Sequence, residues 1–404
     1  MLFEGEYING KKWNGKGYNY DNEVVYELKD GKGLVKEYDN GPLKFLGEYK
    51  DGERNGKGRE YNCGYLIFEG EYWKGKRWNG KGYNKDKKVA YELKKGKGIV
   101  KEYNIINNCL YLEAEYINGE RNGKCKLYAV QGKFQFEGEF RNEMKNGKGK
   151  EYDFLGHYLS FEGEYLYDQK RMGKEYYTNG IVKFEGELLY DKPWNGKGYD
   201  LKGKLIYKLI NGNGKIKDFD DEGRIEYIGE YKNGKRNGKG KEYDNNGRIK
   251  YEGEYVNGYW NGKGKEYYIN SNVIFEGEYL EGKKWTGKGY DINKNMIYEI
   301  KSGAGLIKEY KETGKLITFE GEYKNGERNG KGKEYNKGEL LFYGEFLDGK
   351  RWIGKGKEYA DYNNEDLNFE GEYLNGKRWN GEGYDSDNLD EVQYSNGKKE
   401  KLKY

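Results

Sequence analysis

Apolar and polar residues alternate along short stretches of this chain, which is the period of a β-strand. In one such stretch Leu43, Phe45, Gly47 and Tyr49 share a parity, so on a strand their side chains would point to the same face. A helical period does not fit these stretches, and a glycine every few residues would cost a helix about 1 kcal/mol each. The pattern therefore predicts an all-β chain.

This alternating stretch is repeated along the whole chain. The string Phe-Glu-Gly-Glu-Tyr, or a close variant, begins at Phe3, Phe45, Phe68, Leu112, Phe136, Phe161, Phe184, Tyr227, Tyr251, Phe275, Phe319, Phe342 and Phe369. Shorter units fill the wider gaps, and they begin at Tyr26, Tyr91, Tyr207, Tyr298 and, in a degenerate form, Tyr394. Self-similarity at a period of roughly 20 to 50 residues indicates a repeat architecture. We predict about 18 units in a single array over residues 1–404.

Each unit has the sequence of a β-hairpin. In the first short unit, Asp30-Gly31 separates two brief alternating stretches, which is typical of a two-residue type I′ turn. In the long units we expect a wider loop at the same place, with the basic residues of the repeat in that loop. Joined end to end, the hairpins predict an elongated single-sheet meander.

One tryptophan precedes each short unit at a nearly constant distance. These residues are Trp13, Trp78, Trp194, Trp285 and Trp379. We interpret them as structural plugs, which are aromatic rings that fill the space beside the narrower hairpin. The alternative is a solvent-facing ring that binds a ligand.

The repeat resembles the MORN repeat (membrane occupation and recognition nexus). The matching residues in one unit are Phe68-Glu69-Gly70-Glu71-Tyr72, then Lys74-Gly75, then Gly80-Lys81-Gly82. The Lys-Glu-Tyr-Asp extension and the Leu-x-Phe lead-in are closer to the variant MORN class. The resemblance covers essentially the whole chain, and it implies a twisted sheet of hairpins with a protein-scaffold or membrane-associated role. Enzymatic domains that accompany the repeats in some relatives have no counterpart here.

Composition narrows the function further. Lys and Arg number 74 against 70 Asp and Glu, a net charge of +4, and aromatic residues make up 17% of the chain, which is far too many for a solvated coil. The chain has no run of about 20 apolar residues, so we expect no membrane span. The start of the chain lacks the pattern of a signal peptide. Three cysteines without a CxxC pair suit a reducing compartment, so we expect a cytoplasmic protein. A single histidine, His157, argues against histidine-based metal sites and triads. We expect no enzyme activity, cofactor or metal.

Several apparent motifs belong to the repeat itself. The stretches 75–81 and 282–288 satisfy the first seven positions of a phosphate-binding P-loop, but glycine follows where Ser or Thr should hold magnesium. The acidic stretches 218–223 and 385–391 resemble calcium loops without their spacing, and we expect turns there. The Glu-Gly-Glu pairs face Lys-Gly-Lys on neighbouring strands, so cross-strand ion pairing explains them better than acid–base catalysis.

The basic residues that follow the turn of each long unit, which is Asn-Gly, Asp-Gly or a variant, are the candidate binding residues. They are Lys12, Arg54, Arg77, Arg121, Arg236, Lys284, Arg351 and Arg378. A solvated, aggregation-resistant edge is one interpretation, and a ladder of cations that meets anionic lipid or an acidic protein is the other. The small net charge gives no basic field, so we expect no nucleic-acid partner. We predict a non-enzymatic scaffold for protein–protein interaction. The alternative is peripheral binding to an anionic, phosphoinositide-containing membrane, and association with a membrane or the cytoskeleton would fit either role.

We expect the ends of the array to associate with other chains. The first strand, from Leu2 to Tyr7, carries alternating rings and no capping segment, whereas the stretch 398–403 is charged. An uncovered edge strand offers unpaired N–H and C=O groups to another chain. We therefore expect weak self-association through the N-terminal end, or pairing of that end with a strand of a partner.

Overall fold

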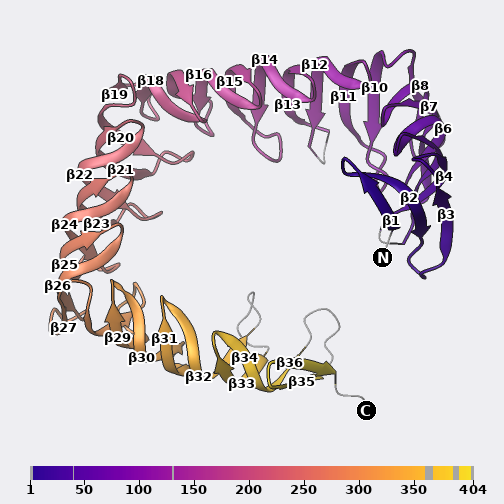
Figure 1. Ribbon diagram of the computed structural model, residues 1–404. Helices are drawn as coiled ribbons and strands as arrows, with labels where there is room; N and C mark the ends of the chain where they lie inside the picture. The colour runs from indigo at the N-terminus through magenta and orange to yellow at the C-terminus, as the bar shows by residue number, and fades with distance from the viewer. Residues whose placement is uncertain (1–2, 40, 130–131, 360–366, 385–390, 402–404) are drawn as a thin grey trace. The chain divides into compact units, whose positions relative to one another are not determined.

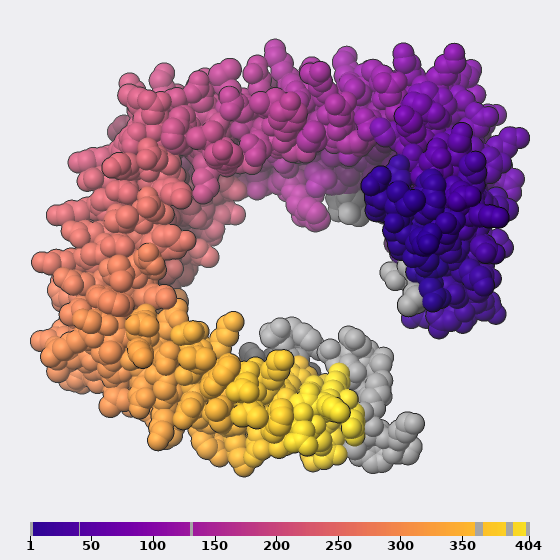
Figure 2. All heavy atoms as spheres, in the orientation of Figure 1, coloured from indigo at the N-terminus to yellow at the C-terminus, as the bar shows by residue number. Residues whose placement is uncertain are grey.

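The computed structural model describes residues 3–39, 41–129, 132–359, 367–384 and 391–401 (Figure 1). Within these residues the chain contains 36 strands and no helix. Inside each sheet every strand pairs antiparallel with the strands next to it in the sequence. This confirms the predicted all-β array of hairpins. The array divides into two compact units, Met1–Leu205 and Ile206–Tyr404, both built from the same hairpin. Along each unit, segments that follow one another in the sequence lie next to one another, as the steady change of colour shows (Figure 2).

The described strands form five sheets. The first contains β1 (Phe3–Ile8), β2 (Lys11–Tyr18) and β3 (Val24–Leu28). The second contains β4 (Gly33–Tyr38), β5 (Leu43–Lys50), β6 (Glu53–Asn62), β7 (Tyr65–Trp73), β8 (Lys76–Tyr83) and β9 (Val89–Leu93). The third contains β10 (Gly98–Tyr103), β11 (Leu110–Ile117), β12 (Glu120–Tyr128), β13 (Phe134–Arg141), β14 (Met144–Tyr152), β15 (Leu159–Leu166), β16 (Gln169–Tyr176), β17 (Val182–Leu189), β18 (Lys192–Tyr199) and β19 (Leu205–Leu209).

The fourth sheet contains β20 (Gly214–Phe219), β21 (Ile225–Lys232), β22 (Lys235–Tyr243), β23 (Ile249–Val256), β24 (Tyr259–Tyr267), β25 (Val273–Leu280), β26 (Lys283–Tyr290) and β27 (Met296–Ile300). The fifth contains β28 (Gly305–Tyr310), β29 (Ile317–Lys324), β30 (Glu327–Asn336), β31 (Glu339–Leu347), β32 (Lys350–Tyr359), β33 (Leu367–Leu374), β34 (Lys377–Tyr384), β35 (Glu391–Ser395) and β36 (Lys398–Lys401).

The prediction of a single continuous sheet is therefore wrong. Every break falls inside a short hairpin, whose two strands share only one bridge beside the turn, as at Lys29 and Lys32. Leu28 and Val35 are buried at the first break, 2% and 0% exposed. Apolar side chains, rather than a ladder of hydrogen bonds, thus join the two sheets there.

Long and short hairpins use the same turn. Asp30 and Gly31 in the short hairpin have φ values of 48° and 67°, and Asn9 and Gly10 in the preceding long hairpin have 50° and 75°. Positive φ at both central residues is the signature of a type I′ turn, which confirms the prediction for the short units. The wider loop expected in the long units is wrong, because their extra residues lie in the strands: β5 and β6 have 8 and 10 residues, β3 and β4 only 5 and 6.

Candidate interaction surface

Each sheet has two unlike faces, which we call the aromatic face and the charged face. On the aromatic face the ring of Phe45 is fully buried and covers two glycines of its own hairpin, Gly47 and Gly58. A Cβ atom at either glycine would lie 2.6–2.7 Å from the ring. The ring of Tyr72, from the next hairpin, meets Phe45 edge to face at 5.1 Å between centroids. Rings and paired glycines thus form the apolar core along each unit.

The predicted binding cations lie on the aromatic face. Arg54, the second residue of β6, places its guanidinium 4.1 Å from the centroid of the Phe45 ring, and its side chain is only 17% exposed. The other seven also lie over rings: Lys12 over Phe3, Arg77 over Phe68, Arg121 over Phe140, Arg236 over Tyr227, Lys284 over Phe275, Arg351 over Phe342 and Arg378 over Phe369. Their predicted position in an exposed loop is wrong, because they are strand residues that cover the core.

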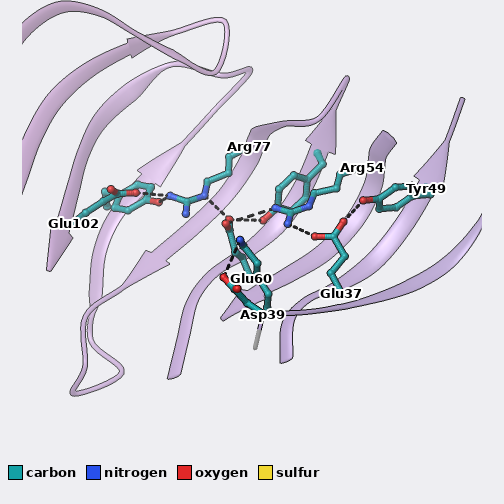
Figure 3. Close-up of polar contacts among 10 residues, drawn as sticks. Glu37, Asp39, Tyr49, Arg54, Glu60, Arg77 and Glu102 are labelled. Carbon is teal, nitrogen blue, oxygen red and sulfur yellow. Dashed lines mark hydrogen bonds and ion pairs between the residues drawn. The ribbon is translucent and has the colours of Figure 1, made fainter. Parts of the chain in front are cut away.

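Seven of these eight cations also form ion pairs with glutamates, and the eighth, Lys12, donates a hydrogen bond to the Tyr26 hydroxyl. Arg54 lies 2.5 Å from Glu37 and 3.5 Å from Glu60, and Arg77 lies 2.8 Å from both Glu60 and Glu102 (Figure 3). The chain of ion pairs runs from β4 to β10, so it crosses the break between the second and third sheets. A comparable chain in the second unit links Glu309, Arg328, Glu334 and Arg351.

The ion pairs set the charge of these glutamates. Burial by itself raises the pKa of Glu60, but the charges and hydrogen bonds of Arg77 and Arg54 outweigh it and hold the pKa below its usual value. The pKa of Glu37 is lowered in the same way, against burial, by Arg54. Both carboxylates therefore remain ionised at neutral pH and neutralise the arginines between them. Sequence reasoning did not single out these glutamates, although the recurrent string that contains them, Lys-Glu-Tyr or Arg-Glu-Tyr, was visible.

The charged face carries an alternating ladder. From β12 to β18, in-register neighbours are Lys126, Glu137, Lys150, Glu162, Lys174, Glu185 and Lys197. Two of these pairs are loose, with 3.4 Å between Lys150 Nζ and Glu162 Oε1 and 3.7 Å between Lys174 Nζ and Glu185 Oε1, and all four side chains are more than 40% exposed. Alternation makes this face electroneutral, and solvent reaches its lysines and glutamates.

Grooves run over the glycine rows on the charged face. The first has a volume of about 780 Å³, with Gly138, Gly149, Gly163 and Gly173 among its lining residues and Lys and Glu side chains on both sides. Glycine leaves a gap between flanking charged side chains, so the backbone forms the floor. The same arrangement recurs in the second, fourth and fifth sheets, with volumes of about 410 to 730 Å³.

The tryptophans lie beside the short hairpins. The rings of Trp13, Trp78, Trp285 and Trp379 lie against the turn glycines of those hairpins, Gly31, Gly96, Gly303 and Gly397. The carbonyl of each tryptophan accepts the N–H of the same glycine, at 2.7–2.9 Å. Trp194 is half-buried in β18. Each of the first four thus fastens a short hairpin to the long hairpin before it.

The remaining motifs lie in ordinary repeat positions. The two stretches that resemble P-loops, residues 75–81 and 282–288, lie almost wholly within strands β8 and β26. Asp220 accepts hydrogen bonds from Arg224 within a turn, and His157 lies in the loop after β14. The acidic stretch 385–391 falls almost wholly outside the described residues. At the first strand Phe3 is buried and Tyr7 is 55% exposed, so only the second of these rings is free to meet another chain.

The described residues contain neither a cluster of metal ligands nor a membrane-spanning helix. No group of three or more His, Cys, Asp or Glu side chains there is arranged to hold a metal ion. Nor does that part of the chain contain a helix with the length and apolar character needed to cross a membrane.

The hairpin register corresponds to a known repeat. The family model of the MORN repeat matches residues 45–62, 113–133, 136–153, 227–247, 251–273 and 319–339. The chain contains MORN repeats. The matched segments lie in both units, and hairpins between them keep the same pairing of glycines, as at Gly163 and Gly173. MORN repeats generally serve interactions with proteins or membranes. A search of curated proteins finds no match to this chain.

Proposed function

We propose that this MORN-repeat chain is a non-enzymatic scaffold that binds protein partners along the charged faces of its sheets. The observation that carries the proposal is the difference between the two faces. On the aromatic face rings, arginines and glutamates satisfy one another, as in the pairing of Arg77 with Glu60 and Glu102. The charged face presents loosely paired side chains and open grooves of several hundred Å³.

The alternative is peripheral binding to an anionic membrane through the basic residues after the turns. A lipid phosphate would have to displace carboxylates that already hold these cations. Lys284, for example, is 19% exposed and lies 2.9 Å from Glu266, and Arg351 lies 2.7 Å from Glu334. Breaking such half-buried pairs leaves a charge without its partner, which is costly. Partner binding on the charged face requires no such exchange, and we therefore prefer the scaffold.

Chemical cross-linking of the full chain to its captured partners tests the scaffold. Lysine-reactive cross-links, mapped by mass spectrometry, are expected at charged-face residues such as Lys126, Lys150 and Lys174, and not at Lys12 or Lys284. Charge reversal by Lys150→Glu and Lys174→Glu should reduce capture and leave the fold intact, because both side chains are more than 40% exposed.

Sedimentation with vesicles is the matched experiment. If the chain sediments with anionic vesicles and not with neutral ones, in a salt-sensitive manner, and no protein cross-links to the charged face, the membrane alternative replaces the scaffold. Retained capture in the charge-reversed variant would also argue against a charged-face scaffold.

A further inference from the structure

The charged face of the fifth sheet departs from the alternating ladder. Ten of the thirteen long repeats carry glutamate before the central glycine, but β31 has Tyr343 there. In β32, Ile353 stands where β34 has Asn380, and β28 contributes Leu306. These three apolar side chains are 49%, 40% and 72% exposed, respectively. All three line one groove of about 730 Å³ over Gly321, Gly332 and Gly344.

Packing within the fold does not account for these residues. Each projects from the face opposite the ring core, and water reaches much of its surface. An exposed apolar group contributes little to folding, whereas an apolar cluster rimmed by charged residues is typical of a binding surface. The cluster spans β28 to β32, four steps between neighbouring strands, or about 19 Å.

The groove also carries a surplus of positive charge. Lys333, a lining residue that faces Tyr343 in register, keeps a carboxylate on only one side, and so does Lys355, which faces Tyr343 from the other side, next to the groove. Lys333 lies 3.7 Å from Glu320, which it shares with Lys308 at 3.9 Å.

The groove of the fifth sheet has a different balance of charged lining residues from the groove of the third sheet. The groove in the fifth sheet is lined by three lysines, Lys308, Lys331 and Lys333, against two glutamates, Glu320 and Glu345. The groove in the third sheet has four of each: Lys124, Lys126, Lys148 and Lys150, and Glu137, Glu139, Glu162 and Glu164. Only the former combines apolar side chains with unbalanced lysines.

We propose that this groove, between β28 and β32, docks an extended, acidic segment of a partner protein whose apolar side chains contact Leu306, Tyr343 and Ile353. The inference rests on the proposed scaffold function and names one docking site within it. Carboxylates of the segment match the surplus lysines, and its apolar side chains cover the exposed cluster. About six extended residues span the distance.

Fluorescence anisotropy with a defined probe tests the docking. The probe is a fluorescein-labelled hexapeptide of alternating Leu and Asp, titrated with the full chain. Tyr343→Glu combined with Ile353→Asn restores residues that sibling repeats carry at these positions, so the fold should be kept. We expect this double substitution to weaken binding at least about tenfold, because it removes two apolar contacts.

Matched controls separate the groove from general charge effects. Ile228→Glu, at the repeat position equivalent to Tyr343 but in β21, should leave binding unchanged. The corresponding hexapeptide with Lys in place of Asp should not bind. The proposal is overturned if the acidic peptide fails to bind the unmodified chain, if the double substitution leaves binding unchanged, or if the basic peptide binds equally well.

Two further outcomes show whether the docking site alone is wrong or whether the groove binds a different class of partner. Loss of binding to phosphatidylserine vesicles in the double variant would show that the groove meets a lipid surface, and the peptide proposal would be wrong. If the double variant still captures its partners and cross-links through Lys126 and Lys150, the scaffold stands and only this docking site is refuted.

Discussion

At the scale of single residues, ring size and glycine are matched across each long hairpin. One repeat shows the rule by its exception: Leu112 replaces the ring, and the two glycines beneath it are replaced by Ala114 and Cys125. All three are buried, at 4%, 1% and 2% exposure. A smaller side chain above the strands leaves room for two Cβ atoms below it, so packed volume is conserved.

This matching predicts the outcome of filling a glycine. In Gly253→Val, the new Cβ would lie 2.5 Å from Tyr251 Oη and 2.6 Å from Gly264 Cα. We expect a loss of roughly 1–3 kcal/mol in the free energy of unfolding, since overpacking forces side chains and backbone to shift. Adding Tyr251→Leu, which imitates Leu112, should recover part of the loss. Urea denaturation of both variants measures this, and a double variant less stable than Gly253→Val would contradict the matching.

The shared carboxylate of Glu60 gives a second prediction. Glu60→Gln leaves Arg54 and Arg77 with one glutamate each, and the Glu60 side chain is only 17% exposed. We expect destabilisation of roughly 1–3 kcal/mol, as for other half-buried charge pairs that lose one partner. Glu69→Gln, on the charged face and 41% exposed, is the matched control and should have a smaller effect. Equal effects in denaturant titrations would mean that the ion-pair chain adds nothing to stability.

At the scale of elements, the short hairpin joins two sheets through its turn. Gly96 donates its N–H to the carbonyl of Trp78 and accepts the N–H of Gly119 from the next long hairpin. Lys76 also forms an ion pair with Glu120, so the two long hairpins are linked across the short one. These contacts compensate for the ladder that is missing between β9 and β10.

Removing the tryptophan should loosen this junction. Trp78→Ala deletes the ring over Gly96, and we expect a loss of roughly 1–3 kcal/mol because the ring is half-buried. Hydrogen exchange should accelerate first at the amides of Gly96 and Gly119, which are bonded at the junction. Trp78→Phe retains a ring and should retain most of the protection. Unchanged exchange at these two amides in Trp78→Ala would show that the ring does not hold the junction.

At the scale of the whole molecule, half-buried glutamates with lowered pKa values occur in both units. Burial raises the pKa of Glu151 and Glu358, but the neighbouring lysines and Arg378 outweigh it, as the arginines do for Glu37 and Glu60. A carboxyl whose pKa is lower when folded stabilises the fold above its unfolded pKa, near 4.5, and the contribution disappears as pH falls through the folded value. Stability should be nearly constant above about pH 5 and decline below about pH 4.5.

The urea midpoint measured against pH checks this. Glu60→Gln should flatten the acid limb, since one linked group is removed. A midpoint that falls when pH rises from 5 to 7 would contradict the assigned direction of these pKa shifts.

Damage in one sheet should remain there. Each hairpin contacts mainly its neighbours, so stability in a repeat array is approximately a sum of local terms. In Gly253→Val, backbone amides within the fourth sheet, between β20 and β27, should exchange faster. Amides of the second and fifth sheets, which contain Phe45 and Phe342, should keep their protection. Uniform loss along all described strands would show a single cooperative unit instead.

The sequence by itself determined the strands, the turns of the short units and the number of hairpins. Alternation such as Phe45, Gly47 and Tyr49 and the turn pair Asp30-Gly31 are encoded within a few residues, and local periodicity specifies them before any distant contact forms. Repetition then made each assignment visible many times. The type of hairpin and the MORN family were therefore accessible without the fold.

Tertiary structure alone decided where the cations and the breaks lie. From the sequence, Arg54 is predicted to be a loop residue beside the turn Asp51-Gly52. Its place over Phe45 and between two glutamates depends on register with strands up to 17 residues away. Likewise, Leu306, Tyr343 and Ile353 are ordinary scattered residues in the sequence, and only pairing from β28 to β32 brings them to one groove. Burial and charge pairing arise between strands, so no local pattern can specify them.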